Sequence, residues 1–184
     1  MKIIAIRHGQ TKLNAEGRVQ GRSDYPLDEV GRKQAKKIIS FLPEDVDAIF
    51  TSPLRRATET AEIINENFGV TMFIDHRLIE RNFGDYEGEL IAGLEMNKLR
   101  SWTDNAYTPN GETIRDVAKR VFDFLDTIKQ TYDGKTILVV AHSHVLRPIS
   151  WYFNGIPIAG KEVVLEIKTG EALKFLHAKH NKMP

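Results

Sequence analysis

The sequence contains no cysteine, which excludes disulfide bonds, thiolate metal ligands and thiol nucleophiles. Long apolar runs are also absent. The run Ile3-Ile4-Ala5-Ile6 ends at Arg7 and is too short for the core of a signal peptide, and no stretch reaches the length of a membrane span. The net charge is only +1, so bulk electrostatics favour neither nucleic acid nor an anionic membrane as a partner. These absences predict a cytoplasmic protein that binds anions only locally.

The remaining composition is typical of a globular protein. The chain has 184 residues, of which 28% are charged and 41% are hydrophobic, with no low-complexity segment and no internal repeat. This length suits one domain with a substantial core and is short for two. We therefore expect residues 1–184 to form a single domain.

Short apolar or β-branched runs alternate with helical patterns along the chain. Strands are predicted at Lys2 to Ile6, Val46 to Thr51, Thr71 to Ile74 and Thr136 to Ala141. Helices are predicted at Leu27 to Phe41, Pro53 to Phe68 and Ile114 to Tyr132. This alternation is typical of an α/β layered fold. Near the C-terminus a hairpin is predicted, with strands at Val163 to Ile167 and Leu173 to Leu176, and it makes the sheet mixed.

The starts of these helices carry recognisable signals. Asp28 is a predicted cap of the first helix, and Ser52-Pro53 offers a cap followed by proline at the first helical position. Pro109 to Thr113 precedes the third helix, where we expect capping rather than contact with an anion. The segment from about 87 to 110 has a helix-like middle and no strand, and we interpret it as a lid over a pocket.

The first predicted strand runs directly into Arg7-His8-Gly9, which places a guanidinium and an imidazole at the carboxyl end of a strand. Ligands of open α/β sheets bind at this edge. The tripeptide alone is a weak motif, so its value depends on the pattern around it.

That pattern continues through five further blocks in the same order. After Arg7-His8-Gly9-x-Thr11-x-x-Asn14 the chain contains Gln20-Gly21-x-x-Asp24-x-Pro26-Leu27, Ser52-Pro53-Leu54-Arg55-Arg56-Ala57, Glu80-x-x-Phe83-Gly84-x-Tyr86-Glu87-Gly88, Pro109-Asn110-Gly111-Glu112-Thr113 and Ala141-His142-x-x-Val145-Leu146-Arg147. The blocks resemble the histidine phosphatase superfamily, also called the phosphoglycerate mutase-like family. The resemblance covers residues 2 to about 150. It implies a three-layer α/β/α sandwich on a mostly parallel mixed sheet.

The resemblance also implies a role for each of five residues. His8 is the expected nucleophile, which attacks phosphorus as a neutral imidazole and forms a phosphohistidine. Arg7 and Arg56 are expected to hold the phosphoryl oxygens, because a guanidinium offers a planar pair of donors and stays charged. His142 is the expected cation that stabilises the transition state. Glu80 is the expected general acid, which requires a raised pKa.

Four further residues are expected to contact the substrate, and two of them, Ser143 and His144, depart from the family pattern. A structural role for His144 stays open. Asn14 and Gln20 are neutral donors, although turn chemistry also accounts for them. Relatives are expected to have two glycines after the second histidine, where this chain has Ser143 and His144. A His-x-His pair also occurs in metal sites, but the arginines already supply positive charge and would repel a metal ion. We therefore expect no metal and no cofactor.

The predicted activity is hydrolysis of a small phosphorylated metabolite. The stretch between Glu80 and Pro109 is shorter than in phosphoglycerate mutases, which favours a phosphatase over a mutase. Alternatives that stay open are a phosphoglycerate mutase-type transferase and a non-catalytic protein that binds phosphorylated ligands. Specificity is expected from residues 87–110 and from His144, with Tyr86, Leu94, Trp102 and Tyr107 as candidates for the entrance. The sequence indicates neither the substrate nor the oligomeric state.

Overall fold

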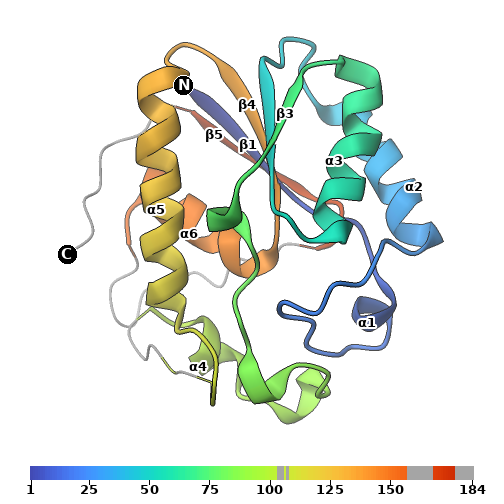
Figure 1. Cartoon of the computed structure of the whole chain (residues 1–184), viewed down its shortest axis with the longest axis vertical. Coiled ribbons are helices and arrows are strands. Elements are labelled where there is room, and N and C mark those ends of the chain that lie inside the picture. Colours follow the sequence, from blue (N-terminus) through green and yellow to red (C-terminus); the bar gives the residue numbers. More distant parts are fainter. Residues whose placement is uncertain (103–105, 107, 157–167, 177–184) are drawn as a thin grey trace.

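A computed structural model of the chain describes residues 1–102, 106, 108–156 and 168–176. Within these residues five strands form one sheet in the order β3-β2-β4-β1-β5. The strands are β1 (Lys2–Arg7), β2 (Ala48–Thr51), β3 (Thr71–Ile74), β4 (Thr136–Ala141) and β5 (Ala172–Leu176). The first four are parallel, and β5 runs antiparallel to β1 at the edge of the sheet. The predicted mixed sheet is confirmed (Figure 1).

Two pairs of helices cover the two faces of the sheet. Helices α2 (Glu29–Ile38) and α3 (Arg55–Phe68) share one apolar cluster with the strands. Helices α5 (Ile114–Thr131) and α6 (Ser143–Asn154) share the other. Figure 1 shows α2 and α3 together on one side of the molecule, well separated from α5. The three-layer α/β/α sandwich is therefore confirmed.

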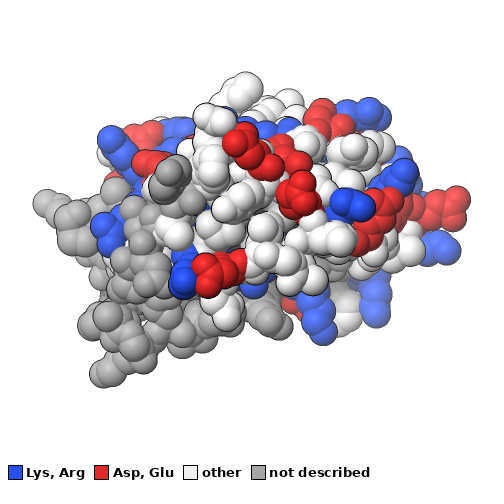
Figure 2. Space-filling view, turned by 90° about the horizontal axis from the view of Figure 1, so that it is seen from below, with Lys and Arg blue, Asp and Glu red and all other residues white. Residues whose placement is uncertain are grey.

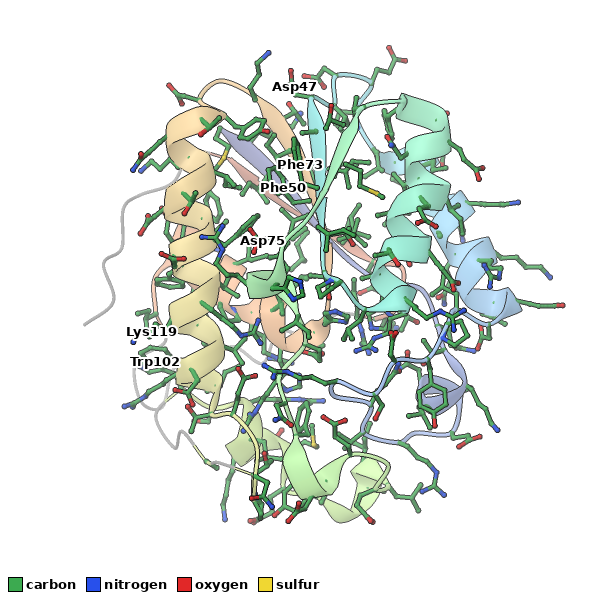
Figure 3. All side chains as sticks on the ribbon, in the orientation of Figure 1. Asp47, Phe50, Phe73, Asp75, Trp102 and Lys119 are labelled. Carbon is green, nitrogen blue, oxygen red and sulfur yellow. The ribbon has the colours of Figure 1, made fainter. Side chains whose placement is uncertain are left out.

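The alternation of side chains along β1 explains both clusters. Ile3 and Ala5 point toward α5 and α6, whereas Ile4 and Ile6 point toward α2 and α3. All four side chains are buried, as expected for a central strand with helices on both faces. The edge strand β3 is less covered, and Phe73 on it stacks on Phe50 of β2 with ring centroids 5.0 Å apart (Figure 3).

Two of the three predicted helix starts are correct. The Asp28 carboxylate accepts a hydrogen bond from the Gly31 amide at 2.7 Å and caps α2. Thr113 caps α5 in a capping box with Asp116. The prediction for α3 is wrong, because this helix begins two residues later, after Leu54, with no side-chain cap.

Helix α6 is not among the helices that the sequence patterns predict. Nine of its residues are buried, on all sides of the helix. Pro148 lies inside this helix, and a proline within a helical pattern is a signal that the helix ends or kinks, so the pattern favours no helix here. The expected strand Val163 to Ile167 lies outside the described residues. None of the described helices is long and apolar enough to cross a membrane.

The segment expected to form a lid lies beyond the carboxyl ends of the parallel strands, at the bottom of Figure 1. Its described part contains the 3-10 helix η4 (Ile91–Gly93) and the short helix α4 (Met96–Arg100), so the helix-like middle is confirmed. The buried guanidinium of Arg81 fixes the position of this segment, because it donates hydrogen bonds to the carbonyls of Leu99 and Ala106. The shorter elements α1 (Lys12–Ala15), η1 (Ile39–Phe41), η2 (His76–Leu78) and η3 (Gly84–Tyr86) complete the described structure.

Candidate active site

The site lies where β1 and β4 end side by side. The register pairs Arg7 with Ala141, so His8 and His142 follow at equivalent positions on neighbouring strands. The His8 amide donates to the Ala141 carbonyl at 3.0 Å, and the two imidazole rings lie 5.0 Å apart at 58°. Sheet pairing thus brings together two histidines that are far apart in the sequence.

The contacts of His8 define the tautomer of its ring. Nδ1 lies 2.7 Å from the carbonyl oxygen of Gly9, which can only accept, so Nδ1 carries the hydrogen. Nε2 therefore holds a lone pair, and it accepts a hydrogen bond from Nε of Arg56 at 3.2 Å. Burial, followed by the charges of Arg56 and Arg7, holds the pKa of His8 well below its ordinary value. The ring is neutral at neutral pH, as its role as a nucleophile requires.

The first loop can approach α2 closely because two glycines face each other. A Cβ atom on Gly9 would lie 2.3 Å from the carbonyl oxygen of Gly31. Any larger residue would push the loop away from the helix. The Gly9 amide also donates to Oγ1 of Thr60 in α3, at 3.1 Å. Gly9 therefore fixes His8 against both α2 and α3.

Arg56 lies at the start of α3 and is almost completely buried. Besides Nε, its two terminal nitrogens donate to the carbonyls of Gly21 at 2.7 Å and Ser23 at 2.9 Å. Burial lowers its pKa to about 10, so it remains charged at neutral pH. The adjacent Arg55, by contrast, has a side chain that is 60% exposed. The structure therefore places Arg56 in the pocket wall and Arg55 on the surface.

His142 is fully buried behind His8. Its Nε2 lies 2.7 Å from Oγ of Ser52, the residue that follows β2. Ser52 thus holds a histidine where the sequence predicts that it caps a helix. Burial and then the charge of Arg56 lower the pKa of His142 well below its ordinary value. The ring is neutral in the protein alone, which differs from the expected cation.

Glu80 is buried in the same pocket, and its electrostatics also differ from the expectation. Oε1 accepts a hydrogen bond from the Arg81 amide at 2.8 Å, and Oε2 lies 3.8 Å from Nδ1 of His144. Burial pushes the pKa of Glu80 upward, but the imidazole of His144 and the Arg81 amide outweigh it and hold the pKa well below its ordinary value. The raised pKa expected of a general acid is therefore absent in the protein alone.

The predicted neutral donors also line the pocket. Nε2 of Gln20 is buried and has no hydrogen-bond partner among the described residues, while its Oε1 lies 2.6 Å from the hydroxyl of Thr11. Oδ1 of Asn14 accepts from the Thr11 amide in a capping box, so turn chemistry explains part of its role. Ser143 contributes to the wall at the start of α6. Gln20 is thus the clearest unused donor of the three.

Two arginines in this pocket are not among the predicted site residues. Arg18 follows α1, and Arg100 ends α4. With Arg7 and Arg56 they bring four guanidinium groups to a cavity of about 160 Å³ whose described wall contains one carboxylate, that of Glu80. No motif marks them in the sequence, because each comes from a separate loop or short helix. The surplus of positive charge suits an anionic ligand.

The aromatic residues expected at the entrance mostly have other roles. Trp102 is buried beside the lower end of α5, where its ring packs edge-on against Trp151 at 5.5 Å (Figure 3). Tyr86 and Leu94 are partly buried against a small cluster around Phe83. Tyr107 lies outside the described residues. His144 is the one of these candidates that lines the pocket in the described part of the structure.

No group of three or more His, Asp or Glu side chains within the described ranges is arranged to hold a metal ion. His142 and His144 do not converge on a common point, since one ring contacts Ser52 and the other faces Glu80. On the face seen from below in Figure 1, acidic and basic side chains are interspersed with uncharged ones (Figure 2). The described pocket wall, by contrast, has four guanidinium groups and one carboxylate.

Comparison with known proteins gives matches that span the site. A sequence profile of the Histidine phosphatase superfamily (branch 1) matches residues 3–169. The Bacillus subtilis (strain 168) protein named uncharacterized phosphatase PhoE is 33% identical over 154 residues, covering 83% of this chain and 77% of that protein. Phosphoglycerate mutase-like protein 4 of Arabidopsis thaliana is 33% identical over 172 residues, covering 87% and 73%. The solved structure of mycobacterial glucosyl-3-phosphoglycerate phosphatase complexed with VO3 has a TM-score of 0.86 at 26% identity, covering 94% and 91%.

Proposed function

Because the chain belongs to the histidine phosphatase superfamily (branch 1), we propose that it hydrolyses a small phosphorylated metabolite through a phosphohistidine at His8. The observation that carries this proposal is the state of His8. Its Nδ1 is engaged by the Gly9 carbonyl, and its Nε2 holds a lone pair beside the Arg56 guanidinium. In-line attack on phosphorus needs a neutral nucleophile next to a cation that receives the phosphoryl oxygens.

In the first step Nε2 of His8 bonds to phosphorus while the bond from phosphorus to the alcohol oxygen breaks. Arg7 and Arg56 hold the equatorial oxygens, and the unused Nε2 donor of Gln20 adds a neutral hydrogen bond. His142 lies against His8 and takes on positive character as negative charge accumulates on the phosphoryl group, because a nearby anion raises the pKa of an imidazole.

Glu80 protonates the departing alcohol oxygen. A phosphomonoester in the pocket brings up to two negative charges beside Glu80 and so raises the pKa that the protein alone keeps low. In the second step water attacks phosphorus, Glu80 takes a proton from the water, and the bond from phosphorus to His8 breaks. Orthophosphate leaves and His8 returns to its neutral form.

The reaction as proposed uses no metal ion. In metal-dependent phosphoryl transfer the cation neutralises the oxygens of the transferred group. Here Arg7, Arg18, Arg56 and Arg100 line the pocket and supply that charge. We expect hydrolysis to persist in EDTA at the rate found without it.

The decisive experiment measures phosphate release from para-nitrophenyl phosphate and from a panel of metabolites. The panel contains sugar phosphates, phosphoglycerates, glucosyl-3-phosphoglycerate, ribazole phosphate and nucleoside monophosphates. We expect activity in EDTA, its loss in His8→Ala, and its retention in His76→Ala, which removes an exposed histidine. A phosphorylated wild-type protein, quenched at alkaline pH because phosphohistidine is acid-labile, should carry the phosphoryl group on His8 by mass spectrometry.

Three results would replace this proposal with another. Isomer formation from 3-phosphoglycerate and its bisphosphate that outpaces phosphate release would make the protein a mutase. Tight binding of phosphorylated metabolites without any turnover would make it a ligand-binding protein. Activity that disappears in EDTA and survives in His8→Ala would identify a metal-dependent hydrolase.

A further inference from the structure

The side chain of His144 occupies a position where glycine is expected in this family. His144 is the second residue of α6, and its side chain is buried to within a few per cent. The ring packs edge-on against Phe83 with centroids 4.9 Å apart at 83°, and Nδ1 lies 3.8 Å from Oε2 of Glu80. An imidazole is therefore fixed beside the carboxylate that acts on the leaving group.

Packing alone does not account for this histidine. Its Nε2 is buried and has no hydrogen-bond partner among the described residues, and the ring lines the pocket. Buried polar atoms are normally paired, so an unpaired nitrogen in a pocket wall calls for a functional reason. An apolar side chain would fill the space beside Phe83 without leaving a buried polar atom unpaired, which costs free energy.

We infer that His144 holds the proton that Glu80 delivers to the leaving alcohol, so that the two side chains act as one proton donor. The inference rests on the proposed function. The present separation of 3.8 Å exceeds a hydrogen bond, but catalytic contacts are often long before the substrate binds and shorten with it.

The electrostatics of the two groups agree with this order of protonation. Burial lowers the pKa of His144 to about 4, against the opposing effect of Glu80, whose own pKa lies well below its usual range. When the pair holds one proton, the imidazole therefore carries it. The charged and titratable groups that face the pair from the surrounding elements are Arg7, His8, Arg56, Arg81, Arg120, His142 and Arg147. The charge of a bound phosphomonoester offsets these cations and raises the proton affinity of the pair.

The proton balance over both steps is closed. As Nε2 of His8 bonds to phosphorus and the ester bond breaks, the alcohol oxygen takes a proton from Glu80, which receives the proton of the His144 imidazolium. Glu80 and His144 are then both deprotonated. When water attacks the phosphohistidine, Glu80 accepts a proton from the water and passes it back to His144. Orthophosphate and neutral His8 are released, and the pair is reloaded.

The test uses the full-length protein and two substrates that differ in their leaving groups. Glycerol 3-phosphate must expel an alkoxide that needs a proton, whereas para-nitrophenyl phosphate expels a stable phenolate. The quantity compared is kcat/KM, because it reports the steps up to formation of the phosphohistidine and not its hydrolysis, which is the same for both substrates. We expect His144→Asn to lower kcat/KM for glycerol 3-phosphate by about 10- to 100-fold, part of what general acid catalysis contributes, and to change kcat/KM for para-nitrophenyl phosphate less than about twofold. His144→Phe, which keeps a ring beside Phe83, should show the same split. His76→Asn, at an exposed histidine, should leave both rates unchanged.

A double-mutant cycle tests whether His144 acts through Glu80. Glu80→Gln alone should reduce kcat for glycerol 3-phosphate, and adding His144→Asn should reduce it no further, because the donor is already absent. Equal losses of kcat/KM on both substrates in both His144 variants, or additive losses in the cycle, would overturn the inference. Failure of the proposed function has a different signature: no wild-type phosphate release, or full activity in His8→Ala.

Discussion

The substitution Arg56→Lys separates the charge of this residue from its geometry. Lysine keeps the positive charge but not the planar set of donors. In the structure Nε of Arg56 donates to Nε2 of His8, while the terminal nitrogens donate to the carbonyls of Gly21 and Ser23. A single ammonium group cannot reach all three acceptors with the same geometry. The loop that contains Gly21 and Ser23 therefore loses part of its anchor.

The expected losses follow from these contacts. If lysine satisfies one carbonyl, the other is left buried without a donor, which costs about 1–3 kcal/mol. For a protein of this size each kcal/mol lowers Tm by about 2–4 °C, so the melting temperature should fall by about 2–12 °C. A donor to the transferred group is also lost, and removing one such donor lowers kcat by about 10²- to 10³-fold.

The assay compares Arg56→Lys with Arg55→Lys, the same change one residue earlier on an exposed side chain. Thermal unfolding followed by circular dichroism gives Tm, and phosphate release from para-nitrophenyl phosphate gives kcat and KM. We expect the Arg55 variant to match the wild type in all three quantities. A kcat for Arg56→Lys within threefold of the wild type, with Tm unchanged, would refute the role assigned to the guanidinium geometry.

Three further outcomes follow from the structure. Gly9→Ala should lower the unfolding free energy in urea by at least about 2 kcal/mol, because the new methyl group meets a carbonyl of α2 at 2.3 Å. Ser52→Ala should lower kcat by about tenfold, since the hydrogen bond to His142 is lost. The unfolding free energy should fall as pH drops below about 6.5, because His8 is buried with a lowered pKa and the unfolded chain then binds more protons.

Each of these has a direct control. For Gly9→Ala the control is Gly93→Ala, which adds the same methyl group where no atom lies within 4 Å. This control should leave the unfolding free energy in urea unchanged. Equal effects of the two alanine variants would argue against the close approach at Gly9. For Ser52→Ala, an unchanged kcat would show that the 2.7 Å contact does not position His142. For the pH dependence, the histidine-to-glutamine variant at His8 should lose less stability between pH 7 and pH 5, and an identical slope would contradict the assignment.

The fold was predictable where local patterns are unambiguous. β1, β3 and β4 are short apolar runs bounded by polar or turn residues, and α2 and α5 have amphipathic stripes behind a capping residue. The start of α3 was not predictable, because Oγ of Ser52 contacts Nε2 of His142 and does not cap the helix. Helix α6 was not predicted because Pro148 lies inside it, and proline is a signal that a helix ends or kinks.

The site was predictable only in its composition. Arg7, His8, Arg56 and Glu80 are marked by the motifs that surround them, and all four line the pocket. No motif in the sequence identifies Arg18, Arg100 or the contact of Ser52 with His142. They enter the site because loops and strand ends from separate parts of the chain converge on one edge of the sheet.

By itself the sequence determined the family and the types of reactive group, because these depend on side chains at strand ends and on their order along the chain. The tertiary structure decided the protonation of those groups. Burial and the charges of Arg56 and Arg7 keep His8 neutral, and Arg56 lies 48 residues away in the sequence. Glu80 stays ionised largely because His144, 64 residues later, lies beside it. Burial and through-space charge set a pKa, and neither is a property of neighbouring residues in the sequence.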